Sequence, residues 1–169
     1  TTSVDNCLIV VAATREDDSS TFAWSAWSGV AGLTERTDYG SIQGNGGGVG
    51  VATGDLATAG ASGALSATVR STVDGHLTIA LTPALSPRWQ ANGTAVQGTG
   101  DIDPAWPTHV ADDIALLFVE SCGGEAAVLA SGHEHGFVEV ANSPQATGSG
   151  TAGTRLTVFW CRATSSTME

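Results

Sequence analysis

The chain contains no lysine, and its six arginines are set against 17 acidic residues. A P-loop nucleotide site and a Schiff-base mechanism both need a lysine, so the sequence excludes them. The net charge of −11 opposes binding to nucleic acid and to anionic membranes, because both carry negative charge. The same acidity keeps many proteins soluble, and by itself it identifies no partner.

Long hydrophobic runs are missing as well. The longest, residues 7–13 and 114–119, have the length of a strand and fall far short of the roughly 20 residues that span a bilayer. We expect no signal peptide, because no basic start precedes an apolar stretch. The three cysteines are odd in number and predict no disulfide framework. We expect buried thiols at Cys7 and Cys161 and an exposed one at Cys122.

Charged residues make up only 14% of the 169 residues, which excludes coiled coils and helical repeat arrays, whereas glycine is abundant with 22 residues. Short apolar segments bounded by Gly, Ser, Thr and Asp are typical of strands. We therefore predict an all-β fold. The predicted strands are 3–13, 48–53, 64–71, 76–82, 114–121, 126–130, 136–140 and 155–162, with weaker signals at 21–28 and 94–98.

Two of these segments predict which of their faces are buried. Residues 64–71 alternate, with Leu65, Ala67 and Val69 on one face and polar residues on the other, so one face should meet water. Residues 114–119 are apolar throughout, which predicts a central strand that is covered on both faces.

Three short blocks occur twice in the same order, which indicates an internal duplication. Residues 5–11 align with 113–119, residues 32–35 with 136–139, and residues 75–81 with 154–160. We predict a jelly-roll-type β-sandwich of two related halves in one compact unit. Its parts are a first repeat (1–83) with a Gly-rich excursion at 44–71, an ordered Pro- and Trp-rich crossover (84–107), and a second, shorter repeat (108–169).

The first repeat starts directly at its leading strand. We therefore expect an unpaired sheet edge near residues 4–13, covered by a neighbouring subunit. The terminal segments 1–5 and 164–169 should be ordered chiefly by neighbours, since isolated termini fray. Deleting residues 1–5 should then weaken association more than it weakens the isolated fold.

His133, Glu134 and His135 form the best candidate metal site, because residues two apart on a strand share a face. His109, Asp112 and Asp113 could complete it. Gly132 and Gly136 flank the triplet, which favours a solvated loop, and we predict no metal and no cofactor. The acidic groups 16–18 and 101–103 lack the spacing of a dedicated calcium loop, so solvated turns are favoured there too.

No Gly-x-Ser-x-Gly elbow is present, and nothing in the sequence supports a Cys–His pair at Cys122, so we predict no enzyme. Gly148, Gly150 and Gly153 match G-x-G-x-x-G, but a strand follows them where a dinucleotide site needs a helix. Trp24 and Trp27 should face opposite sides of a strand, which spoils a sugar-stacking platform. Trp160 is predicted to lie in the core.

The sequence resembles the β-sandwich modules of virion proteins from tailed bacteriophages. These modules combine an Asp-led apolar strand, a Gly-aromatic turn and a closing strand with an aromatic residue. The residues that carry the likeness are 106–109, 112–120, 136–137, 142–144 and 153–160. The resemblance implies a role in assembly and transfers no catalytic residue.

We therefore expect a structural capsid decoration (cement) protein at the virion surface. Its partners would be the major capsid protein or other virion subunits and copies of itself, with trimers as one oligomer that matches local capsid symmetry, and neither nucleic acid nor a membrane. The alternative is a receptor- or glycan-binding module of a tail fibre or cell-surface protein, with His133, His135 and Tyr39 as candidates. A hydrolase on the same sandwich ranks third.

Overall fold

The computed structural model describes residues 1–16, 19–20, 24–44, 46–69, 74–83, 87–122, 125–132 and 135–168. Within these ranges the regular elements are ten strands and one short 3₁₀ helix, and every strand pair is antiparallel. The predicted all-β class is confirmed. None of the described segments is a helix long and apolar enough to cross a membrane.

The first sheet has the strand order β3-β4-β1-β6. Its strands are β1 (Cys7–Arg15), β3 (Ala31–Ser41), β4 (Gly47–Leu56) and β6 (Asp74–Leu81). β1 pairs with β4 on one side and β6 on the other, and all nine of its residues are buried. The predicted free edge near residues 4–13 is therefore wrong, because the leading strand lies in the middle of its sheet.

The second sheet has the order β7-β10-β8, and β9 also pairs with β10. Its elements are β7 (Ile114–Cys122), β8 (Val138–Glu139), β9 (Gln145–Thr147) and β10 (Thr154–Arg162), with the 3₁₀ helix η1 (Gly150–Ala152) before β10. Among the described strands β7 pairs with β10 alone, and its residues are half-buried or exposed. The prediction that 114–119 form a central, fully covered strand is therefore wrong.

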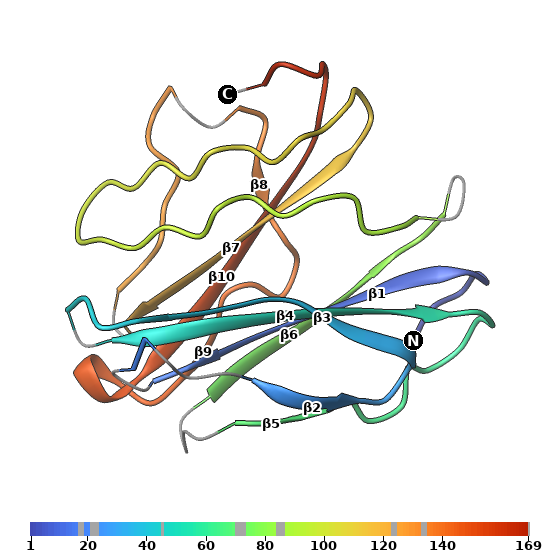
Figure 1. Ribbon diagram of the computed structural model, residues 1–169, viewed down its shortest axis with the longest axis horizontal. Coiled ribbons are helices and arrows are strands. Elements are labelled where there is room, and N and C mark those ends of the chain that lie inside the picture. The colour runs from blue at the N-terminus through green and yellow to red at the C-terminus, as the bar shows by residue number, and fades with distance from the viewer. Residues whose placement is uncertain are drawn as a thin grey trace.

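A small third sheet consists of β2 (Ser25–Ser28) and β5 (Ser66–Thr68), which Figure 1 shows below the first sheet. The alternation predicted for 64–71 is confirmed over the described part, since Leu65, Ala67 and Val69 are less exposed than Ser66 and Thr68. The strand itself is shorter than predicted, and residues 70–71 lie outside the described ranges.

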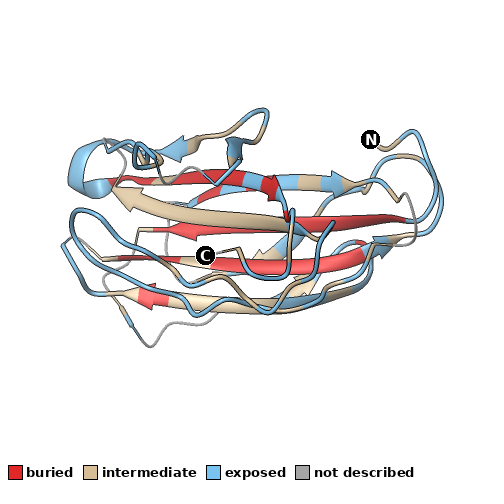
Figure 2. Ribbon diagram, turned by 90° about the horizontal axis from the view of Figure 1, so that it is seen from above, coloured by how far each residue is buried: buried red, intermediate tan, exposed pale blue. Residues whose placement is uncertain are grey.

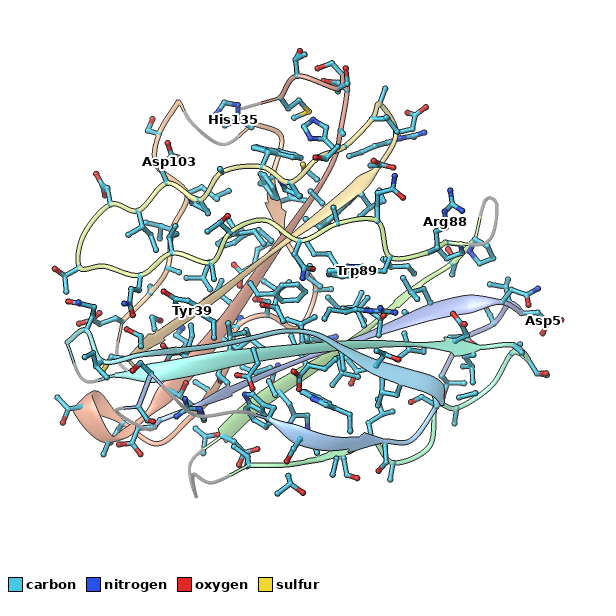
Figure 3. The ribbon with its side chains drawn as sticks, in the orientation of Figure 1. Asp5, Tyr39, Arg88, Trp89, Asp103 and His135 are labelled. Atoms are coloured by element: carbon cyan, nitrogen blue, oxygen red, sulfur yellow. The ribbon has the colours of Figure 1, made fainter. Side chains whose placement is uncertain are left out.

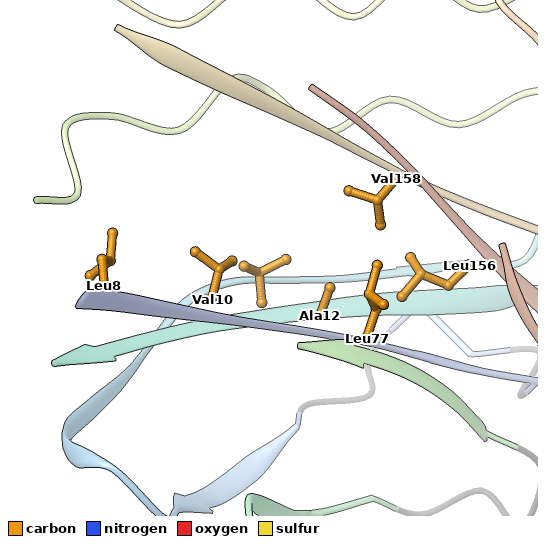
Figure 4. Close-up of a cluster of buried hydrophobic side chains, with 7 residues drawn as sticks. Leu8, Val10, Ala12, Leu77, Leu156 and Val158 are labelled. Carbon is orange, nitrogen blue, oxygen red and sulfur yellow. The ribbon is translucent and has the colours of Figure 1, made fainter. Parts of the chain in front are cut away.

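Alternate residues of β1 fill two separate hydrophobic cores. Leu8, Val10 and Ala12 point toward β10, where they pack with Val51, Leu77, Leu156 and Val158 (Figure 4). Cys7, Ile9 and Val11 point the other way, toward Val30, Trp27 and Leu65. Burial is accordingly concentrated in the middle of the molecule (Figure 2). β1 is thus covered on both faces, and so is the middle of β10, where Val158 and Phe159 point in opposite directions and are both buried.

The crossover described over residues 87–107 has no regular strand but packs on the sheets. The Arg36 guanidinium on β3 lies 5.8 Å from the centroid of the Trp89 ring, and Asn92 Nδ2 donates to the Arg36 carbonyl at 2.6 Å. The Trp106 ring lies 5.4 Å from that of Phe137, centroid to centroid. Figure 3 shows Trp89 in the middle of the molecule. The packing expected of this Pro- and Trp-rich segment is present.

Four segments differ from the predicted strand list. Residues 126–130 and 94–98 are irregular, whereas β3 and β9 were not predicted at all. β3 lies at a sheet edge and is largely polar, with the side chains of Glu35, Arg36, Asp38 and Tyr39. Its sequence therefore lacks the alternation of apolar and polar residues that predicts a strand.

The first and third repeated blocks pair in the same register in both halves. Leu8 lies opposite Leu81, and the aligned residues Leu116 and Trp160 lie opposite each other. The middle blocks differ, because 32–35 belong to β3, which pairs with β4, whereas β8 pairs with the closing strand β10.

The N-terminal segment is bound to its own chain, contrary to the expectation that neighbours order it. The Thr2 amide donates to the Gly60 carbonyl at 2.7 Å, and Asp5 Oδ1 accepts from the Ala59 amide at 2.7 Å. Deleting residues 1–5 is therefore expected to lower the free energy of unfolding of the isolated chain by about 2 kcal/mol, at roughly 1 kcal/mol per hydrogen bond. Urea denaturation measures this, and an unchanged midpoint would contradict it.

Candidate functional site

A polar cluster lies at the end of the first sheet where β1 ends, and it consists of Arg15, Asp38, Glu120 and Thr154. The Arg15 side chain is fully buried, and its Nη2 donates to the Ser19 carbonyl at 2.9 Å. Across the sheet, Arg15 lies opposite Gly48 of β4. A Cβ atom on Gly48 would lie 2.9 Å from Arg15 Nε, so glycine here leaves room for the guanidinium.

Glu120 approaches the same end of β4 from the second sheet. Its carboxylate lies against the backbone of Gly47, where a Cβ atom would collide with both oxygens. Thr154 Oγ1 of β10 donates to Glu120 Oε1 at 2.9 Å. Burial raises the pKa of Glu120 to about 7, although the Thr154 hydroxyl and the charge of Arg15 both act to lower it. Glu120 thus joins β7, β10 and β4 and binds a proton near neutral pH.

Asp38 of β3 is the second carboxylate of the polar cluster and accepts a hydrogen bond from the Trp24 amide. Burial raises its pKa, and Glu35 adds to this effect, whereas the Trp24 amide and Arg15 oppose it.

Two hollows in the surface lie away from the polar cluster, one beside Asp74, His76 and Gln145 and the other beside Asp103, Trp106 and Met168. Neither hollow includes a residue of the polar cluster, so the geometry indicates a role in joining the sheets.

Trp24 and Trp27 do not face opposite sides, so that prediction is wrong. Their ring centroids lie 5.6 Å apart with a tilt of 31°. The reason is local: Ala26 between them has a left-handed backbone with φ of 51°, and the β2–β5 register shifts there. Trp24 is buried against Gly50 of β4, whereas Trp27 Nε1 donates to Glu35.

Replacing Gly50 with alanine is expected to destabilise the fold by about 2 kcal/mol, within the range for overpacking a tight site. The added Cβ would overlap the Trp24 indole, which is itself held in the core. Chemical denaturation gives the value, and near-UV circular dichroism reports the displaced indole. Gly98→Ala is the control, because Gly98 does not have a positive φ and only the exposed Ile102 side chain lies near its added Cβ. Equal stability of wild type and Gly50→Ala would contradict the packing.

The metal-site candidates are not brought together in the described ranges. His133 and Glu134 lie outside those ranges, and His135 is exposed. His109 Nδ1 lies 2.8 Å from the Pro107 carbonyl, and Asp112 pairs with Arg162 at 2.9 Å. The described part of the chain contains no group of three His, Cys, Asp or Glu side chains that could hold a metal ion.

The remaining sequence candidates are also scattered. Asp113 Oδ2 accepts from the Val110 amide in a turn, Asp101 and Asp103 are exposed, and Asp17 and Asp18 lie outside the described ranges. Tyr39 and His135, the described members of the glycan-binding candidates, lie well apart in Figure 3.

The predicted buried thiols are confirmed, since Cys7 and Cys161 are buried and free. Cys122, predicted to be exposed, is only partly exposed. The Cys122 thiol donates to the Gly150 carbonyl at 2.7 Å, so it is engaged with the turn before β10.

Large apolar side chains are exposed at one end of the second sheet, and we call Ile114, Val138 and Trp160 the apolar face. Trp160 pairs with Leu116 of β7 and with Val138 of β8, so these side chains share one face of the sheet, and Ile114 lies two residues from Leu116 on that face. Their exposed fractions are 44% for Ile114, 52% for Val138 and 40% for Trp160. The predicted core position of Trp160 is therefore wrong.

The apolar face continues the inner, core-forming face of the second sheet. Val158, two residues before Trp160 on β10, is fully buried in the core between the sheets. Figure 4 shows β7 and β10 diverging from β1 and β6 from the Leu156 end toward the Leu8 end. The same sheet face is thus buried at one end and exposed at the other.

Comparison with protein-family models, curated proteins and solved structures finds no match for this chain.

Proposed function

We propose that the chain is a structural protein of a tailed-phage virion that decorates the outside of the capsid shell and has no catalytic role. The observation that carries this proposal is the apolar face, since exposed clusters of large apolar side chains on a soluble domain mark surfaces that bind other proteins. The partners in this proposal are the major capsid protein and further copies of the chain, with trimers matching the local symmetry of a shell.

The fold proposed with this function is a jelly-roll-type sandwich that arose from two related halves. The shared register of Leu8 with Leu81 and of Leu116 with Trp160 supports the duplication. β4 lies beside β1 in the first sheet, and no described strand takes the matching place beside β7 in the second sheet. In this proposal the chain acts by burying its surface against its partners, which requires no catalytic residues.

The proposed function is tested by the copy number of the chain in purified particles. A decoration protein is expected at high, stoichiometric copy number per shell, in quantitative mass spectrometry of particles after sedimentation. A chain that stays in the supernatant would overturn the virion assignment.

The alternative is a glycan- or receptor-binding module of a tail fibre. The hollow beside Trp106 favours it, because an indole next to the carboxylate of Asp103 combines a stacking surface with a hydrogen-bond acceptor for sugar hydroxyls. A fibre component would be present at only a few copies per particle, so the same measurement separates the two functions.

A further inference from the structure

We infer that the apolar face is the binding site for the capsid subunit, and that it binds a protein surface with an apolar centre and a basic rim. This inference rests on the proposed function and names the chemistry of its partner. Trp160, the largest side chain of the apolar face, is the expected anchor, because tryptophan residues carry much of the binding energy in protein interfaces.

The apolar face is formed by three different strands and therefore has a fixed shape. β7 supplies Ile114, β8 supplies Val138 and β10 supplies Trp160 between them. The strands are joined by their hydrogen-bond ladders, and the turn before β7 is fixed to β10 by the Asp112 amide, which donates to the Ala163 carbonyl at 2.8 Å. A rigid apolar surface loses little conformational entropy when it binds.

Charge selects the partner. Arg162, on the same sheet face as Trp160, pairs with the exposed Asp112, so this pair adds no net charge to the apolar face. Each copy of the chain carries a net charge of −11, which opposes two copies meeting at this face, so the self-contacts of the proposed trimer lie outside it. A partner that presents lysine or arginine around an apolar centre complements this net negative charge.

The test is a sedimentation binding assay with the full chain and shells of the major capsid protein encoded by the same genome. Trp160→Ser and Val138→Ser are compared with Val128→Ser, a matched control because Val128 is 81% exposed and lies outside the apolar face. We expect Trp160→Ser to weaken binding about tenfold or more, Val138→Ser to weaken it severalfold, and Val128→Ser to leave it unchanged. Thermal melts show whether each variant folds. If Trp160→Ser does not fold, the comparison of Val138→Ser with Val128→Ser tests the inference by itself.

The outcomes separate this inference from the proposed function. If the wild type does not bind shells, the proposed function fails. If the wild type and all three variants bind shells equally, the decoration function holds, but the apolar face is not the surface that binds the capsid subunit. Binding that is insensitive to salt between 50 and 300 mM overturns the basic rim. Self-association of the free chain that Trp160→Ser abolishes, without any loss of shell binding, assigns the face to a second copy instead.

Discussion

Replacing Glu120 with glutamine is expected to remove most of the loss of stability that the protein suffers as the pH rises from about 4.5 to 7. The folded protein holds the Glu120 proton with a pKa of about 7, against the ordinary 4.5 of the unfolded chain. A carboxyl with a raised pKa stabilises the fold below the unfolded value, and this stability is lost as the pH rises to the folded value. The difference corresponds to about 3 kcal/mol at roughly 1.4 kcal/mol per tenfold change in proton affinity.

Glutamine keeps the shape of Glu120 and an oxygen that accepts the Thr154 hydroxyl, but it carries no charge. At pH 8 the Glu120→Gln variant is therefore expected to be more stable than the wild type, by up to about 3 kcal/mol. Urea denaturation between pH 4.5 and 8 measures both proteins. Glu139→Gln, on the exposed strand β8, is the control and should keep the wild-type slope. Identical pH slopes for Glu120→Gln and the wild type would contradict the burial of this carboxylate.

Nothing in the sequence marks Glu120 as a buried carboxylate, and the reason is physical. Glu120 ends an apolar run, where an acidic residue normally marks the return of a strand to solvent. Its burial depends on Gly47 and Thr154, which are 73 and 34 residues away along the chain. Only the pairing of the sheets brings these three residues together, and single-sequence reasoning does not reach such pairings.

The strand content was predictable because β1, β7 and β10 are rich in branched or aromatic apolar residues and are bounded by glycine and polar residues. The layering was not. The sequence of β1 shows that it is apolar on both faces, but so does the sequence of β7, and hydrophobicity alone does not decide which of them lies in the middle. Strand pairing decides it: β1 has β4 on one side and β6 on the other, whereas β7 has β10 as its one partner among the described strands.

The apolar face was missed for a related reason. Trp160 belongs to the same alternating set as Leu156 and Val158, and the pattern predicts the same burial for all three. The two sheets diverge from the Leu156 end, however (Figure 4). Trp160 is accordingly 40% exposed, whereas Leu156 and Val158 are fully buried. Alternation predicts which face of a strand is apolar, and the crossing of the sheets decides how far along that face is covered.

Replacing Leu156 with alanine is expected to cost about 3 kcal/mol of unfolding free energy, in the middle of the range for buried leucines. Leu156 is completely inaccessible to solvent and packs between the two sheets, so the cavity would open where β10 meets the first sheet. For a chain of this length, the melting temperature should fall by roughly 6–12 °C.

The exposed Val128 again provides the control, and Val128→Ala should change the unfolding free energy by less than about 0.5 kcal/mol. Comparing Leu156→Ala with Trp160→Ala then tests the divergence of the sheets directly, because both side chains lie on one face of β10. If the sheets diverge as described, Leu156→Ala lowers stability strongly, whereas Trp160→Ala, at a half-exposed position, costs less despite removing a larger side chain. The reverse order of costs, measured by urea denaturation, would mean that the second sheet is covered at the Trp160 end, and the apolar face would then be part of the core.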